Sequence, residues 1–93
     1  PKRISYSQAS NSLTDYLVSN GKFENNYGEF ENGDVGYLEY KKITEISSEE
    51  YYIINCEIED KDGKSVSSQS YAVSCESGTV YGVKYNGGSY SLD

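Results

Sequence analysis

Apolar and polar side chains alternate with a period of two from residue 35 to residue 85. Successive side chains of a strand point to opposite faces, so this period predicts strands that bury one face. Between the alternating segments lie Ser, Asp, Asn and Gly, the residues typical of turns. The sequence therefore predicts four antiparallel strands, over residues 35–46, 50–59, 66–75 and 79–85, and residues 89–93 are a candidate for a short edge segment.

A helix is predicted before the strands, over about residues 6–19. Ser5 and Gln8 have the spacing of a capping box, in which each side chain accepts a hydrogen bond from the other residue's backbone N–H. An apolar stripe follows at helical spacing, made of Ala9, Leu13, Tyr16 and Leu17. Asn20-Gly21 then supplies a left-handed stop. The predicted fold is α+β: one N-terminal helix packs on one face of a four-stranded antiparallel meander, and the face that carries glutamates stays in water.

The 93 residues are enough for one domain with one core, so residues 1–93 are expected to form a single domain. Leu, Ile, Val and Phe together supply only 18 residues, a fraction usual for disordered chains. The eleven tyrosines compensate, because each can bury its ring while its hydroxyl reaches a polar partner. Residues 22–34 are expected to form an acidic loop whose two phenylalanine rings tuck against the domain, ending in a turn at Asn32-Gly33.

Composition excludes several classes of function. The chain lacks histidine, so a Ser-His-Asp or Cys-His pair and a histidine-ligated metal site cannot be built. Two cysteines do not make a four-thiolate zinc site. The net charge of −7 is wrong for a nucleic-acid binder, and no apolar run is long enough to span a membrane. We expect no catalytic residue, no metal ligand and no cofactor.

Cys56 and Cys75 permit two interpretations. In an oxidising compartment a disulfide between them would close a loop of roughly 20 residues and stabilise the fold by about 3 kcal/mol. Alternatively, both are buried free thiols that act as small apolar side chains. If Asp62-Gly63 centres a two-residue turn, Cys56 faces a residue near Gln69 and Cys75 lies roughly 20 Å further along the sheet. Both interpretations therefore remain open.

Residues 24–62 carry twelve acidic and three basic side chains. This excess either solubilises a wet sheet face or forms a surface for a basic partner. Glu57 and Glu59 are expected on the exposed side of their strand, and Tyr37 and Tyr51 are the tyrosines expected to face outward. Asp60-x-Asp62-Gly63 resembles part of a calcium loop, but two ligand positions lack suitable oxygens, so it predicts a turn.

Part of the predicted sheet resembles a known family. Tyr51-Tyr52-Ile53-Ile54-Asn55-Cys56-Glu57-Ile58 leads into Asp62-Gly63, and Tyr71-Ala72-Val73 is followed by Ser77-Gly78-Thr79-Val80-Tyr81. This order, over about residues 50–85, resembles the C-terminal sheet of PepSY-like domains, small modules of bacterial secreted proteins and lipoproteins that are similar in shape to cystatin-like folds. Where the family carries an Asp-Ala type pair, this chain has Cys75-Glu76, and its hairpin is longer. The resemblance implies an envelope-associated, non-enzymatic module that restrains a protease or binds another protein.

Three hypotheses of function follow. The first is a non-enzymatic binding or regulatory module of a bacterial extracytoplasmic protein, with a protein partner that carries basic groups. The alternative is an intracellular acidic inhibitor of the phage type, which occupies the basic groove of a nucleic-acid-binding protein. The third, a small enzyme, has no support in the sequence. The thiol state separates the first two, since a bonded pair favours export and free thiols favour the cytosol.

Overall fold

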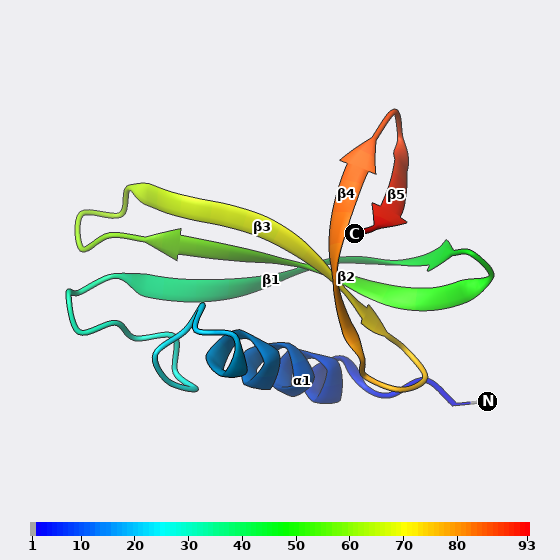
Figure 1. Cartoon of the computed structure of the whole chain (residues 1–93), viewed down its shortest axis with the longest axis horizontal. Helices are drawn as coiled ribbons and strands as arrows, with labels where there is room; N and C mark the ends of the chain where they lie inside the picture. Colours follow the sequence, from blue (N-terminus) through cyan, green and yellow to red (C-terminus); the bar gives the residue numbers. More distant parts are fainter. Residues whose placement is uncertain (1) are drawn as a thin grey trace.

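A computed structural model describes residues 2–93 of the chain as one helix and one antiparallel sheet. The elements are α1 (Tyr6–Ser19), β1 (Val35–Ile46), β2 (Glu49–Glu59), β3 (Ser65–Ser74), β4 (Val80–Asn86) and β5 (Ser89–Leu92). Each strand pairs with its neighbour in sequence, so the sheet order is β1-β2-β3-β4-β5. Figure 1 shows α1 lying across one face of this sheet. The predicted α+β architecture is confirmed.

The predicted number of strands is wrong, because residues 89–92 form a fifth strand. Asn86 pairs with Ser89, and β5 runs antiparallel to β4 as far as the pair Val83–Leu92. The two residues between them, Gly87 and Gly88, have φ angles of +62° and +90°. A two-residue turn that follows the twist of its strands needs two such positive angles, which glycine adopts without steric cost.

α1 begins and ends as its sequence predicts. The Ser5 hydroxyl accepts a hydrogen bond from the backbone N–H of Gln8 (3.1 Å), and the Gln8 side chain accepts one from the N–H of Ser5 (2.8 Å). Asn20 caps the C-terminus, and Gly21 follows with a φ of +70°. Of the residues that the structure describes, no helical segment has the length and apolarity needed to cross a bilayer.

The main core lies between α1 and the sheet, and tyrosines take the place of aliphatic side chains there. Tyr52 and Tyr71 are 6 % and 4 % exposed. Tyr71 packs edge-to-face with Tyr16 of α1 at 5.9 Å between ring centroids, and Tyr52 packs with Tyr6 at 6.0 Å. The other buried members of this core are Ala9, Leu13, Leu17, Phe23, Ile54, Cys56, Val73 and Cys75. The helix stripe therefore buries against the face expected from the alternation.

The acidic loop between α1 and β1 is fixed by its two phenylalanines. Phe23 is buried, and its ring meets that of Phe30 edge-to-face at 6.0 Å. The Phe23 ring occupies the space beside Gly36, where a Cβ atom would come within 2.5 Å of it. The N–H of Gly36 donates to the carbonyl of Gly28 at 2.7 Å. The tucked rings are confirmed, and they bring this loop against the start of β1.

The face of the sheet opposite α1, here called the back face, is only partly in water. At one end it holds a second core, made of Ile46, Tyr51, Ile53, Ala72 and Val83, with Tyr90 and Leu92 packed against it. Figure 1 shows that the β4–β5 hairpin rises on the side of the sheet away from α1. The expectation of a wholly wet back face is therefore wrong at this end, because the twisted sheet folds its last two strands over it.

Candidate protein-interaction surface

The open end of the back face gathers three of the residues proposed from sequence. Tyr37 of β1 pairs with Glu57 of β2, and Val35 pairs with Glu59. Side chains of paired residues lie about 5 Å apart at Cβ, so Tyr37 and Glu57 are direct neighbours. Glu39, two residues after Tyr37, shares their face. We name these residues the acidic face: Tyr37, Glu39, Glu57 and Glu59.

The acidic face is accessible to a partner. Tyr37 is 52 % exposed, which confirms the prediction that it faces outward. Glu39 is exposed. Glu57 and Glu59, which were expected to be exposed, are half-buried on the open side of β2, because β2 lies between β1 and β3. Glu39 was not predicted from sequence as part of this surface, although its position two residues after Tyr37 indicates that both lie on the same face of β1.

Hydrogen bonds connect the acidic face to β3. The hydroxyl of Ser65 donates to the carboxylate of Glu57, which directs that carboxylate toward β3. Asn55 Nδ2 donates to the Ser68 hydroxyl at 3.2 Å, and the Ser70 hydroxyl donates to Asn55 Oδ1 at 3.3 Å. The back face at this end is therefore a polar surface that extends from β1 to the border of β3.

Most of the negative charge on this surface is uncompensated. Lys41 Nζ lies 3.1 Å from Glu39 Oε1, an exposed pair of the kind that contributes little stability. Within residues 2–93, neither Glu57 nor Glu59 forms an ion pair. Two partly desolvated carboxylates on one strand attract a cationic group more strongly than fully solvated ones.

Tyr51 does not belong to this surface, so its predicted exposure is wrong. It lies on the same face of β2 as Glu57 but at the other end of the strand, and it is 4 % exposed. Its ring packs edge-to-face on that of Tyr81 of β4 at 6.1 Å. Burial raises the pKa of the Tyr51 hydroxyl. Alternation fixes the face of a residue, but the crossing of β4 decides which end of that face is covered.

The two cysteines are both buried and both free. Cys56 pairs with Gln69 across β2 and β3, as the turn arithmetic predicts, while the N–H of Cys75 donates to the carbonyl of Glu50. Cys56 and Cys75 therefore lie six residues apart along the sheet, roughly 20 Å, and a disulfide needs Cα atoms within about 7 Å. Burial raises the pKa of the Cys56 thiol to about 11 and also raises that of Cys75. The disulfide is not formed.

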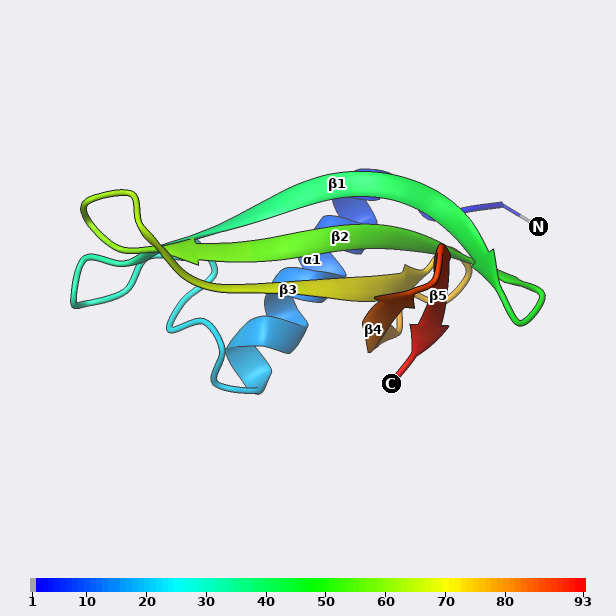
Figure 2. The ribbon, with the colours of Figure 1, turned by 90° about the horizontal axis from the view of Figure 1, so that it is seen from above.

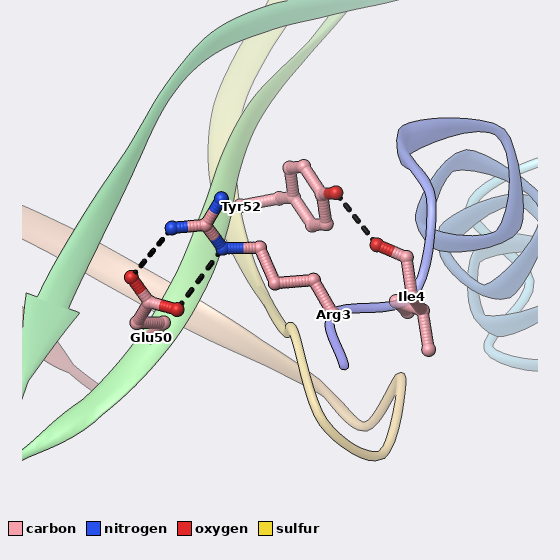
Figure 3. Close-up of polar contacts among 4 residues, drawn as sticks. All are labelled: Arg3, Ile4, Glu50 and Tyr52. Carbon is pink, nitrogen blue, oxygen red and sulfur yellow. Dashed lines mark hydrogen bonds and ion pairs between the residues drawn. The ribbon is translucent and has the colours of Figure 1, made fainter. Parts of the chain in front are cut away.

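A second polar cluster holds the segment before α1 against the sheet (Figure 3). The Arg3 guanidinium donates two hydrogen bonds to the Glu50 carboxylate, at 3.0 and 2.9 Å. The Tyr52 hydroxyl donates to the carbonyl of Ile4 at 2.6 Å, and the N–H of Ile4 donates to the carbonyl of Cys75 at 2.8 Å. The Arg3 hydrogen bonds lower the pKa of Glu50. No sequence signal links these residues, which lie far apart in the chain.

A shallow pocket of about 180 Å³ lies beside this cluster. Its lining carries both signs of charge: Lys2, Arg3, Ser48, Glu49, Glu50, Cys75 and Glu76. Arg3 and Glu50 are already paired with each other, and burial raises the pKa of the Cys75 thiol. The Arg3–Glu50 pair and the hydrogen bonds of Ile4 with Tyr52 and the Cys75 carbonyl hold the segment before α1 against the sheet.

The Asp60-x-Asp62-Gly63 segment is a turn, as predicted. Asp60 Oδ1 accepts hydrogen bonds from the N–H groups of Asp62 and Lys64, both at 2.9 Å. The N–H of Asp60 donates to the carbonyl of Lys64 at 2.8 Å, and Gly63 has a φ of +81°. The carboxylate of Asp60 thus stabilises its own turn by accepting hydrogen bonds from the turn's backbone. Within residues 2–93, no three acidic or cysteine side chains converge in a way that could hold a metal ion.

Comparisons of the chain with protein-family models, with curated proteins and with solved structures found no match.

Proposed function

We propose that this chain is a non-enzymatic protein-binding module that binds a basic partner through the acidic face. One observation carries the proposal: pairing of β1 with β2 brings Tyr37 beside Glu57 on the part of the sheet that neither α1 nor the β4–β5 hairpin covers. An exposed tyrosine supplies contact area at low entropic cost, and unpaired carboxylates beside it select a cationic partner.

The proposed absence of catalysis is supported by the places of the acidic groups. Glu57 and Glu59 lie on an open strand face without an enclosing cavity around them. The carboxylate of Glu50, which lines the shallow pocket beside the segment before α1, is held by Arg3. Paired carboxylates that perform acid–base chemistry need a site that excludes water and places a substrate between them.

Two settings for the module are proposed. The resemblance of residues 50–85 to PepSY-like domains supports a bacterial extracytoplasmic protein, either secreted or attached to the envelope. The buried free thiols of Cys56 and Cys75 favour the alternative, an intracellular acidic inhibitor that occupies the basic groove of a nucleic-acid-binding protein. Both settings use the same acidic face, so one experiment on that face tests the shared proposal.

The test is quantitative capture of proteins from an extract of the source cells on three immobilised forms of the chain. They are the wild type, the face variant E57Q/E59Q and the control variant D15N/E24Q, which has the same net charge as the face variant but changes α1 and the acidic loop. We expect a partner that the wild type and the control retain, that the face variant loses and that about 0.5 M salt releases. Equal retention by all three forms at every salt concentration would refute the proposal.

A further inference from the structure

Half of β3 has a free outer edge. β4 pairs with β3 only at Tyr71, Ala72 and Val73, whereas β2 pairs with β3 from Ser74 back to Ser65. Figure 2 shows β3 along the border of the sheet, with the β4–β5 hairpin at one end of it. The side chains of residues 65–69 are all exposed. Among residues 2–93, no strand pairs with the outer side of Ser65–Ser70, so this segment is an edge strand.

The backbone groups that face this open edge can be identified. The N–H of Ser74 donates to the carbonyl of Thr79, on the side of β3 where β4 lies. Backbone N–H and C=O groups alternate in direction along an antiparallel strand, so those of Ser70 and Ser68 point to the same side as those of Ser74. Beyond the reach of β4, Ser68 and Ser70 therefore present unpaired N–H and C=O groups to solvent.

The opposite border of the same sheet is protected. The start of β1 is covered by the acidic loop, through the bridge Glu29–Val35 and the hydrogen bond from Gly36 to Gly28. Further along, the register shifts between Tyr40 and Lys42, and the exposed Lys41 stands at the bulge. Bulges and lysines are the devices that prevent pairing at an edge. On β3 the register shifts at Val66, and the stretch Ser67–Ser70 beyond this bulge is regular and contains neither a charge nor a proline.

We propose that the edge Ser65–Ser70 of β3 accepts an extended segment of a partner protein as an added strand, with basic side chains of that segment over the acidic face. This proposal deepens the proposed function and rests on it. Backbone hydrogen bonds from Ser68 and Ser70 supply the pairing, and side chains at alternate positions of the added strand supply the specificity.

Charge decides which occupant fits this edge. The Glu57 carboxylate is drawn over β3 by the Ser65 hydroxyl, so it lies within reach of a long lysine or arginine side chain on a strand added next to β3. A second copy of this chain would instead bring another Glu57 to the same place, in a molecule whose net charge is already −7. Like charges at one interface are destabilising, so the occupant is a basic segment of a different protein.

The experiment uses a defined probe, a capped peptide in which lysine alternates with threonine or valine. The variant is S68P, which removes the outward N–H of Ser68; proline is tolerated on an edge strand where that N–H faces solvent. The matched control is S68T, which keeps the N–H and a hydroxyl. A second probe, N-methylated at every other residue, keeps the charge of the first but lacks the donors that would pair with β3.

We expect the wild type and S68T to bind the peptide, and hydrogen exchange at the Ser68 and Ser70 amides to slow when it binds. S68P should bind about tenfold more weakly, since it loses a backbone donor at the centre of the pairing. The N-methylated probe should lose binding to the wild type by a similar factor, and this arm requires no change to the protein. E57Q should weaken binding and reduce its dependence on salt.

Three outcomes would overturn the inference. If S68P and the N-methylated probe bind like their controls while E57Q/E59Q weakens binding, the acidic face binds basic partners without strand addition, and the proposed function survives alone. If sedimentation shows that the wild type forms a dimer that S68P abolishes, the occupant of the edge is a second copy. If no variant changes binding of the peptide, the proposed function fails as well.

Discussion

The second core on the back face makes a sharp prediction about two adjacent residues of β2. Ile53 and Ile54 point to opposite faces of the sheet, and both are fully buried. Ile54 lies in the core under α1, and Ile53 lies in the core closed by the β4–β5 hairpin. If both cores are as compact as the structure shows, truncation of either side chain to alanine should destabilise the fold to a similar extent.

The expected magnitude follows from the atoms removed. Isoleucine to alanine deletes three buried carbons, which costs about 2.4 kcal/mol in transfer free energy alone. With the cavity left in a closed core included, truncations of this kind cost roughly 2–5 kcal/mol in all. A domain of this length has about 5–14 kcal/mol of stability in all, so I53A and I54A should each remove a large part of it.

Urea unfolding followed by circular dichroism measures these losses, with the slope m checked for constancy across the variants. V66A is the control, because Val66 is 57 % exposed and its truncation should change the unfolding free energy by less than about 0.5 kcal/mol. A back face in contact with water would make I53A behave like V66A. An I53A loss below about 1 kcal/mol beside a large I54A loss would refute the second core.

Three further predictions concern the turn, the segment before α1 and the thiols. Ser47 and Ser48 join β1 to β2 with φ angles of +51° and +72°, which asparagine and glycine adopt more readily than serine. S47N/S48G should therefore stabilise the fold by about 1 kcal/mol in urea unfolding. No gain in stability would contradict the turn geometry. Arg3 lowers the pKa of Glu50, so their pair stabilises the fold above the unfolded pKa of a glutamate, and this stabilisation is lost as the pH falls through the lowered value. E50Q should therefore be less stable than the wild type at pH 7 and equally stable at low pH. A stability difference that does not change with pH would exclude the pair as its cause. The pKa of Cys56 is raised to about 11, so the unfolded chain loses the thiol proton first and the stability of the fold should decrease from about pH 9 to pH 11. In thermal melts, the stability of C56A should decrease less over this range. The same decrease in C56A and the wild type would contradict the burial of this thiol.

Local sequence signals were enough to predict the helix, the first four strands and the face of the sheet that α1 covers. The capping box of Ser5 and Gln8 located the start of α1, and the alternation around Ile54 located the strands and the face that α1 covers. The pairing of Tyr37 with Glu57 depends on the register shift between Tyr40 and Lys42, which no sequence pattern predicted; the outward direction of Tyr37 followed from alternation within its own strand. Such features depend on residues close in the chain, where spacing determines geometry.

The remaining features depend on the twist of the whole sheet. Tyr51 and Ile53 are buried because β4 crosses the back face, and no pattern within β2 specifies that crossing. The run Tyr51-Tyr52-Ile53-Ile54 did carry a signal, since four consecutive apolar residues are typical of a strand buried on both faces. The free edge of β3 had no signal, because alternation predicts a strand and does not state how far the next strand accompanies it.

The order β1-β2-β3-β4-β5 has a consequence for how the chain reaches its native state. Every strand pairs with the one before it, so each hairpin closes over a short stretch of chain, and such local topologies fold quickly. The hydrogen bond between Ile4 and Cys75 joins the segment before α1 to the residue that follows β3. We expect it to form only after β3 has paired with β2, because that pairing creates the surface to which the segment before α1 is attached.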